Sequence, residues 1–262
     1  MKTFLIEAVV DGNYLLPAHS HGYEITEAVR FDTWWNRDEV RYSYVLWDTA
    51  ANTDFKSYLN RNVIPVGSIE FCLRWFNAMG VNPKPLNVPQ ELWKYCHREL
   101  YIDTLDNIPH NIPHGKYFCK SINEAKSPIN QELIVINPQV NNPHLKQDTL
   151  KTLITDKHFY SEWVDIISEW RVFVLDKKIV GTQCYSGDSF VLPDIKKYEQ
   201  LIKEYDKRCY TLDLMVYNNL IEYVTDIVEV HDFFACGLYG FDDYSTLLRM
   251  HKIATLEILK GK

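Results

Sequence analysis

Two short apolar strands that carry acidic side chains constrain this chain more than any other stretch. The first reads Thr211-Leu212-Asp213-Leu214, and the second reads Ile227-Val228-Glu229-Val230-His231-Asp232. Because side chains alternate across a strand, Glu229 and His231 share one face, and Asp213 joins them if the two strands pair. An acid in an apolar strand is costly unless a metal ion, a partner charge or water compensates it.

The residues alone leave two interpretations of this cluster open. Asp213, Glu229 and His231 on one sheet face predict a site for a hard divalent cation, which takes oxygen ligands. Alternatively, the strands lie at an edge of the sheet, and the acids simply face solvent.

Composition limits the class of protein. The chain has 262 residues, 46% of them hydrophobic and 24% charged, which suffices for a sizeable core in one or two domains. A net charge of −7 and a pI near 5.7 argue against a nucleic-acid-binding or membrane-binding surface. The six cysteines form no CxxC pair and predict reduced core thiols of a cytoplasmic protein. An acid at Glu7 argues against a signal peptide, and no apolar run approaches the roughly 20 residues of a membrane span.

The N-terminal third has an α/β pattern. We expect strands over 4–10, 42–47 and 62–66. Ser68 is placed to cap a helix that ends near Gly80, and a second helix is predicted from about Gln90 to Leu100. Prolines and a glycine between residues 103 and 115 indicate a domain boundary.

Two lysines and an arginine precede the acid-bearing strands. Lys120 ends a predicted strand over 116–120, and Lys126 follows in the polar loop 121–130. Lysines around a flexible loop can hold phosphate oxygens, although solvated lysines are the commoner outcome of such a composition. Arg171 lies in a strand with two apolar faces and needs an anion, which is either an acid such as Glu169 or a ligand phosphate.

The C-terminal pattern adds a turn over 176–178, a returning strand over 179–185 and a helix after Asp194. A last helix is predicted from about Asp243, after the two acid-bearing strands.

The order of these pieces resembles the ATP-grasp superfamily, and most of all its small viral and bacterial clade characterised by one arginine and two lysines. Phe118-Cys119-Lys120 and Ala125-Lys126 are similar to the two lysine elements, and residues 168–174 to the arginine strand. Residues 210–213 and 229–232 resemble the two acidic elements, and Leu238-Tyr239-Gly240 resembles the closing loop. The likeness spans roughly residues 63 to 251, and it rests on order and spacing rather than on any single piece.

The chain departs from the family pattern at His231, where the family usually has asparagine. An imidazole nitrogen suits manganese or zinc better than an amide oxygen does. This departure predicts a changed metal preference, a weakened second metal site or a degenerate enzyme.

The resemblance implies an α/β (α+β) fold. We expect an N-terminal α/β domain of the kind that precedes ATP-grasp domains over residues 1–105, followed by an ATP-grasp domain over 106–262. The latter would have two lobes built on antiparallel sheets, a small one over about 106–165 and a large one over about 166–262.

The resemblance also implies an ATP-dependent carboxylate–amine ligase that forms an acylphosphate and releases ADP. The acceptor would be an amino acid, a peptide or a protein, and the cofactors would be ATP and Mg²⁺ or Mn²⁺. The resemblance assigns Lys120, Lys126 and Arg171 to the phosphates, and it makes Arg171 and Lys126 the catalytic groups. It assigns Glu162, Trp163 and Val164 to adenine and ribose. It assigns Asp213, Glu229 and His231 to metal.

A second function class competes with the ligase. The chain would then be a catalytically degenerate nucleotide-binding module with a regulatory or host-interaction role, which His231 favours. The retained Lys120, Arg171, Asp213 and Glu229 favour the ligase. We expect neither nucleic acid nor membrane as a partner, a location in the cytoplasm (of the host, if viral), and the oligomeric state stays open.

Overall fold

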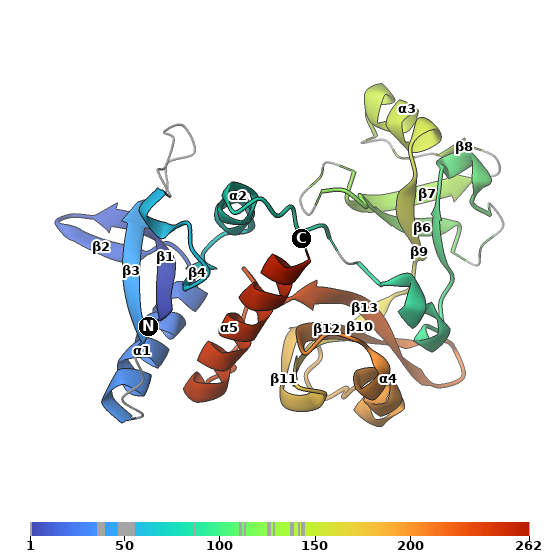
Figure 1. Cartoon of the computed structure of the whole chain (residues 1–262). Helices are drawn as coiled ribbons and strands as arrows, with labels where there is room; N and C mark the ends of the chain where they lie inside the picture. The colour runs from blue at the N-terminus through green and yellow to red at the C-terminus, as the bar shows by residue number, and fades with distance from the viewer. Residues whose placement is uncertain are drawn as a thin grey trace.

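Three units follow one another along the chain in the computed structural model, which describes residues 2–35, 40–46, 56–85, 87–109, 112, 114–124, 127, 129–136, 139–140, 142 and 145–261. An N-terminal unit is connected to a small lobe, and a large lobe completes the chain (Figure 1). Helices and antiparallel sheets are combined, so the expected α/β (α+β) class is confirmed.

The N-terminal unit is a small sheet with a helix on each side. Its strands are β1 (Lys2–Asp11), β2 (Tyr14–Pro17), β3 (Val40–Leu46) and β4 (Val63–Val66), with the short helical turn η1 (Lys56–Tyr58) before β4. β1 runs parallel to β3 and β4 and antiparallel to β2. The side chains of β1 alternate between the two faces of the sheet: Phe4 and Ile6 join one apolar cluster with α1, and Leu5 joins another with α2.

Helix α1 (Ser20–Trp35) falls in a stretch where the sequence pattern indicates only short strands. The physical reason lies on its inner face. His21, Thr26 and Asp32 are buried there beside Ile25 and Val29, so the apolar periodicity that predicts a helix is broken by polar residues.

Helix α2 (Ile69–Ala78) begins and ends as the sequence indicates. The Ser68 hydroxyl accepts a hydrogen bond from the Phe71 amide at 3.2 Å, which satisfies one of the free donors of the first turn. Gly80 follows the helix with a φ of 78°, a conformation that glycine adopts without steric cost.

The predicted helix over Gln90–Leu100 is wrong in its second half. Only a 3-10 helix, η2 (Gln90–Tyr95), forms there, and Cys96 is already extended. The buried carboxylate of Asp226 accepts hydrogen bonds from the amides of His97 and Arg98, at 3.2 and 3.1 Å. A tertiary contact therefore draws the backbone out of the helix.

The small lobe is a five-stranded antiparallel sheet in the order β5-β9-β6-β7-β8. Its elements are β5 (Leu100–Asp103), η3 (Leu105–Asn107), β6 (Lys116–Lys120), β7 (Gln131–Ile136), β8 (Gln139–Val140), α3 (Gln147–Thr155) and β9 (His158–Glu162). Tyr117, Leu133 and Tyr160 are buried in its core with Leu153 of α3. Because β5 pairs with β9, we propose that the boundary with the N-terminal unit lies before residue 100 rather than at 105.

The large lobe is a four-stranded antiparallel sheet in the order β11-β10-β12-β13. Its elements are β10 (Ile166–Leu175), β11 (Lys178–Gly187), η4 (Ile195–Tyr198), α4 (Glu199–Glu204), β12 (Cys209–Asn218), β13 (Tyr223–Asp232) and α5 (Tyr244–Lys260). One face, with Val172 and Leu212, packs against Tyr198 and Leu201 of η4 and α4. The opposite face is covered at one end, where Phe173 and Cys209 join a further apolar cluster.

Helix α5 covers that end of the large-lobe sheet and packs against both the large lobe and the N-terminal unit. Figure 1 shows it between the N-terminal sheet and the sheet of the large lobe. Its side chains Leu247 and Met250 share one apolar cluster with Phe4 and Val66 of the N-terminal sheet and with Phe173 of β10. The N-terminal unit and the large lobe are thus joined through a common core.

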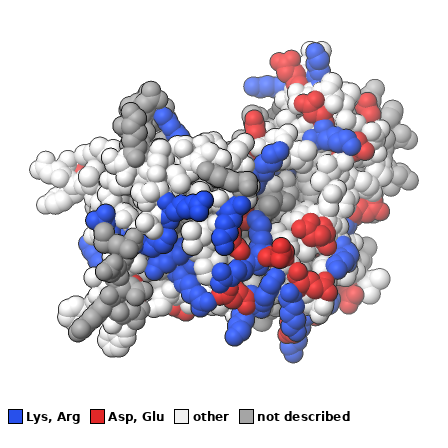
Figure 2. Space-filling view, in the orientation of Figure 1, with Lys and Arg blue, Asp and Glu red and all other residues white. Residues whose placement is uncertain are grey.

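Charged side chains are spread over the face in Figure 2, and lysines and arginines gather near its middle, in the region of α5. Part of this positive charge is compensated locally, since the carboxylate of Asp176 accepts from both Arg208 and Arg249. Among the described residues, no helix combines the length and apolar character that a membrane crossing requires.

Candidate active site

The centre of the site is a row of three charged side chains across three neighbouring strands. Arg171 on β10 stands opposite Asp213 on β12, and Asp213 stands opposite Glu229 on β13. Residues that face each other in a sheet project on the same side. The pairing on which the acid cluster depends is therefore confirmed, and the arginine joins the same face.

Arg171 and Asp213 form a buried, two-pronged ion pair. The Arg171 Nε donates to Asp213 Oδ1 at 2.9 Å and Nη2 donates to Oδ2 at 2.7 Å, with the two side chains 7% and 2% exposed. The third arm, Nη1, donates to the Gly237 carbonyl at 2.9 Å. Burial would lower the pKa of Arg171, but the hydrogen bonds and the charge of Asp213, together with the nearby Cys236 and Tyr239, outweigh it and raise that pKa. The anion that Arg171 requires is thus Asp213 rather than Glu169.

Lys120 and Glu229 connect the two lobes. The Lys120 Nζ at the end of β6 donates to Glu229 Oε2 on β13 at 2.7 Å, and both side chains are partly buried. Burial works to raise the pKa of Glu229, but the charge and hydrogen bond of Lys120 outweigh it and lower that pKa. Glu229 is therefore a carboxylate at neutral pH.

His231 lies two residues after Glu229 on β13, on the same face of the strand and opposite Thr211. Burial lowers the pKa of its imidazole, which is thus neutral at pH 7. Its Nδ1 is buried and has no hydrogen-bond partner among the described residues. A neutral imidazole with a free ring nitrogen is chemically able to bind a metal ion.

The donor set fits a cation that is shared with a ligand better than one held by protein alone. Within the part of the chain that the structure describes, no three His, Cys, Asp or Glu side chains converge closely enough to hold a metal ion. Mg²⁺, however, commonly takes only one or two carboxylates and completes its shell with water and substrate phosphates. Asp213 and Glu229, facing each other across β12 and β13, meet that requirement.

Two tyrosines lie against the Arg171 guanidinium. Its Cζ is 5.6 Å from the ring centre of Tyr185 on β11 and 5.1 Å from that of Tyr239, which belongs to the loop before α5. The two rings stack on each other with centres 5.1 Å apart. These cation–π contacts hold the guanidinium in place independently of Asp213.

A cavity of about 520 Å³ opens between the two lobes beside this row. Phe118 and Phe159 line it from the small lobe, and Met215 and Val228 line it from the large lobe. Lys120 and Glu169 lie in the same lining, and burial raises the pKa of the Glu169 carboxyl. A cavity with apolar walls and a cation in its lining suits a flat base attached to phosphate.

A local irregularity in β13 places a cavity-lining side chain directly before the acid of the charged row. The strand register shifts after Asp213, so that Asp213 pairs with Glu229 while Leu214 pairs with Ile227. Val228 is the extra residue of this β-bulge, a feature that redirects side chains. As a result Val228 lines the cavity next to Glu229 instead of pointing to the opposite face.

The three residues expected to hold adenine and ribose, Glu162, Trp163 and Val164, all line the cavity. Glu162 Oε2 accepts from the Glu99 amide at 3.2 Å, and the Trp163 amide donates to the Lys116 carbonyl at 3.2 Å. The Trp163 amide is therefore occupied. Recognition of a base by the Trp163 carbonyl or by the backbone of Val164 stays a prediction.

A second, smaller cavity of about 140 Å³ lies on the other side of Lys120. Ile69 and Leu73 of α2 line it together with Asn87 of the connector, Glu229 and His231. The N-terminal unit, the small lobe and the large lobe meet here.

The structure brings together Lys120, Arg171, Asp213, Glu229 and His231, whereas Lys126 lies outside the described residues. The sequence reasoning missed Arg98 and Asp226, a buried pair at the large cavity. Asp226 carried the same signal as Asp213, an acid in an apolar strand, but Arg98 lies in a polar connector without any pattern.

Comparison with known proteins adds the fold family. Residues 95–247, more than half of the chain, match the model of the family described as "ATP-grasp domain, R2K clade family 2". No curated protein matches the chain.

Several solved structures are similar to this chain. N5-carboxyaminoimidazole synthetase from Staphylococcus aureus aligns with a TM-score of 0.52 and 10% identity over 100% of this chain and 77% of its own. D-alanine–D-alanine ligase from Bacillus anthracis, complexed with ATP, has a TM-score of 0.49 and 12% identity over 99% and 98%. A RimK domain protein from Sphaerobacter thermophilus has a TM-score of 0.48 and 13% identity over 100% of both chains.

Identities this low speak for a shared fold alone, and it is the match over residues 95–247 that assigns the family. The expected resemblance is thereby confirmed, and the chain belongs to the ATP-grasp domain family of the R2K clade, family 2.

Proposed function

We propose that this chain is an ATP-dependent carboxylate–amine ligase that works through an acylphosphate and releases ADP and phosphate. The observation that carries the proposal is the pairing of Lys120 with Glu229 and of Arg171 with Asp213, at the point where the two lobes meet beside the large cavity. Cations that hold phosphate and acids that hold a metal ion are what phosphoryl transfer requires.

ATP would lie with its base in the large cavity and its phosphates toward Lys120. The base is proposed to fit between Phe118 and Phe159 on one side and Met215 and Val228 on the other. Lys120 would then exchange Glu229 for a phosphate oxygen, and Arg171 would offer its planar fork to two oxygens. Lys126 is proposed as a further phosphate ligand on the sequence resemblance alone.

Asp213 and Glu229 are proposed to hold Mg²⁺ together with phosphate oxygens, and His231 is a third candidate ligand. When bound, Mg²⁺ would neutralise charge on the phosphates and orient them. In this structure each acid is paired with a basic side chain. Binding of nucleotide and metal would therefore have to break both ion pairs together.

The chemistry balances without a protein nucleophile. A carboxylate oxygen of the first substrate attacks the γ-phosphorus, the bond to the β–γ bridging oxygen breaks, and ADP leaves. The amine of the second substrate then attacks the acyl carbon, loses a proton, and phosphate leaves. Arg171, with Tyr185 and Tyr239 against it, would stabilise the charge on the transferred phosphoryl group.

The acceptor is proposed to enter through the 140 Å³ cavity, because Lys120 borders both cavities. If the base occupies the larger cavity and the phosphates reach Lys120, an acceptor in the smaller cavity would lie near the γ-phosphate end. Glu124, Glu229 and Asp232 in its lining favour a substrate with an amino group. We propose an amino acid or the end of a peptide or protein.

Nucleotide binding is tested by thermal unfolding with ADP or a non-hydrolysable ATP analogue, each with Mg²⁺, Mn²⁺ or EDTA. A ligand that binds only the folded chain raises the melting temperature by mass action. We expect a rise that requires the metal, and a larger rise with Mn²⁺ than with Mg²⁺ if His231 is a ligand. No rise at millimolar nucleotide would contradict the proposal.

Substitution of Glu229 by alanine should abolish the metal-dependent rise and lower ATP turnover by about 100-fold or more. The loss of folding stability should stay below the roughly 3–5 kcal/mol that breaking a fully buried pair costs, because the Lys120 and Glu229 side chains are only partly buried, and thermal unfolding of the variant without ligand measures it. Glu222→Ala, an exposed position just before the same strand, serves as the control. Equal turnover in the two variants would remove Glu229 from the metal site.

Hydroxylamine separates the ligase from the degenerate nucleotide-binding module that His231 favours. It attacks an acylphosphate to give a stable hydroxamate, so a ligase supplied with ATP, Mg²⁺ and its carboxylate accumulates that product. A panel of amino acids and short peptides would be screened for it and for phosphate release. Nucleotide binding without either product across the panel would favour the degenerate module.

A further inference from the structure

A second buried ion pair, apart from the charged row, lies beside the large cavity, and Arg98 is part of the cavity lining. Arg98 Nη1 is 3.1 Å from Asp226 Oδ2, and the two side chains are 4% and 0% exposed. Removing two opposite charges from water is costly, so a pair this deep calls for a role beyond surface stability.

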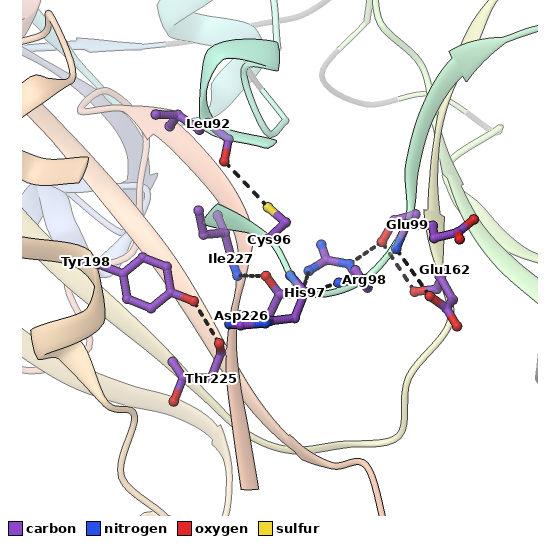
Figure 3. A network of polar contacts seen from close by, with 11 residues as sticks. Leu92, Cys96, His97, Arg98, Glu99, Glu162, Tyr198, Thr225, Asp226 and Ile227 are labelled. Carbon is purple, nitrogen blue, oxygen red and sulfur yellow. Dashed lines mark hydrogen bonds and ion pairs between the residues drawn. The ribbon is translucent and has the colours of Figure 1, made fainter. Parts of the chain in front are cut away.

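The pair is one part of a network that ties three segments together (Figure 3). Asp226 on β13 accepts hydrogen bonds from the amides of His97 and Arg98, and Arg98 Nε donates to the Ser161 hydroxyl on β9 at 2.5 Å. Next to it, the Glu99 amide donates to Glu162 Oε2 at 3.2 Å, and the Glu162 amide donates to the Glu99 carbonyl at 2.9 Å. The network therefore connects the large lobe directly to the small lobe.

The strand registers place this connection between the two walls of the cavity. Asp226 stands opposite Met215, which lines the large-lobe wall, and Ser161 stands opposite Phe118, which lines the small-lobe wall. Arg98 itself is part of the lining. Its guanidinium thus reaches from the large-lobe wall to the small-lobe wall at the edge of the large cavity. We call the space between these two walls the slot.

We propose that Arg98 and Asp226 are positioning residues that fix the width of the slot for the nucleotide base, an inference that rests on the proposed nucleotide binding. A flat ring in contact with both walls needs them about 7–8 Å apart, twice the carbon–carbon contact distance. A planar guanidinium that is hydrogen-bonded to Ser161 through Nε and ion-paired with Asp226 through Nη1 would hold the walls at such a separation before the nucleotide arrives. The slot then selects a base by its fit and does not have to close on it.

A double variant tests this without leaving a charge buried. Arg98→Met with Asp226→Asn removes both charges, and the asparagine oxygen still accepts from the amides of His97 and Arg98. The matched control is Lys94→Met with Glu204→Gln. That pair, at 3.0 Å, ties the same connector to the large lobe, but it is exposed and away from the cavity.

Three probes report on separate parts of the site: a non-hydrolysable ATP analogue, the corresponding GTP analogue and inorganic tripolyphosphate, each with Mg²⁺ in a calorimetric titration. We expect the double variant to bind the ATP analogue about tenfold more weakly, because walls that are no longer held in place must be ordered by the base when it binds. Its preference for the ATP over the GTP analogue should shrink, and its affinity for tripolyphosphate should stay unchanged. The control should match the wild type with all three probes.

Other outcomes overturn the inference in distinct ways. If the wild type binds the ATP analogue and the double variant keeps its affinity and base preference, the pair is only structural. If all three probes weaken equally, the pair supports the fold and not the slot. A wild type that binds no nucleotide would refute the proposed function itself. Should the double variant fail to fold, Ser161→Ala removes only the bond to Arg98 Nε and must shift the base preference in the same direction.

Discussion

The four charged side chains at the centre of the site form two ion pairs. To bind a ligand, each side chain would have to give up its present partner. Arg171 holds Asp213 with two hydrogen bonds, and Lys120 holds Glu229 with one. Such pairing keeps buried charges compensated before the ligand arrives. If the proposed function holds, phosphate and metal would bind together, because either one alone would leave one member of a pair without its counter-charge.

Arg171→Met should lower the free energy of unfolding by about 3–5 kcal/mol, because it leaves the buried carboxylate of Asp213 without its counter-charge. Chemical denaturation measures the loss. Replacing both residues, Arg171→Met with Asp213→Leu, should recover most of the stability. The affinity for ADP should fall by about 1–3 kcal/mol in both variants. An unaltered ADP affinity would make Arg171 a structural residue only.

Single residues were predictable from the sequence more readily than their partners. Acids in the apolar strands around Asp213 and Glu229 are unusual enough to be noticed without a structure. The anion of Arg171 stayed open between Glu169 and a ligand, because a contact between β10 and β12 depends on register, which no local pattern reports. The connection of Arg98 to Asp226 crosses from a connector to a strand and was missed for the same reason.

Strands and helices followed the sequence pattern where their apolar face was unbroken. β6 and the bounds of α2 agree with the predicted ranges, and β10, β12 and β13 are somewhat longer than predicted. α1 escaped prediction because polar residues occupy its buried face, and the helix predicted to reach Leu100 stopped early because Asp226 binds the connector. In both cases a tertiary partner decided the outcome.

The packing of β11 against the loop before α5 gives a prediction for one glycine. A Cβ on Gly181 would come within 2.5 Å of the ring of Phe241, which stacks on Phe173 with ring centres 4.4 Å apart. Gly181→Ala should therefore destabilise the large lobe by about 1–3 kcal/mol, as overpacking does. It should also displace Tyr239, two residues before Phe241, from Arg171.

Urea denaturation and the fluorescence of the tyrosines would follow this change. Ile179→Ala, on the same strand and 39% exposed, is the matched control and should alter stability by about 0.5 kcal/mol or less. An unchanged midpoint for Gly181→Ala would mean that the ring of Phe241 moves aside without cost.

The molecule as a whole is held together at α5, where a buried histidine lies in the shared core. His251 packs against Phe4 of the N-terminal sheet and against Phe233 of the large lobe, and its Nε2 has no hydrogen-bond partner among the described residues. Burial lowers the pKa of His251 from 6.5 to about 3. The folded chain keeps this imidazole neutral, whereas the unfolded chain takes up a proton below pH 6.5.

Stability should therefore be fully present above pH 6.5 and should decrease as the pH falls from 6.5 toward 3. His21, whose pKa burial also lowers, acts in the same direction. His251→Leu should reduce the loss of melting temperature between pH 7 and pH 5, as measured by calorimetry. An equally steep loss in the variant would assign the acid sensitivity to other groups.

The common core also decides how many folding units the chain has. The cluster around Leu247 and Met250 includes residues of β1, β4 and β10, so the N-terminal unit and the large lobe should unfold in one transition. The expected division of the chain into an N-terminal and an ATP-grasp domain is then one of topology rather than of independent stability.

Helix α5 has a further consequence, which concerns the order in which the chain is made. Protein domains generally fold as they leave the ribosome, N-terminal parts first. Here β1 and β4 emerge long before α5, and until it follows, α1 alone covers the face that bears Phe4 and Val66. During synthesis the N-terminal unit would therefore leave part of its apolar surface uncovered until the large lobe and α5 have been made.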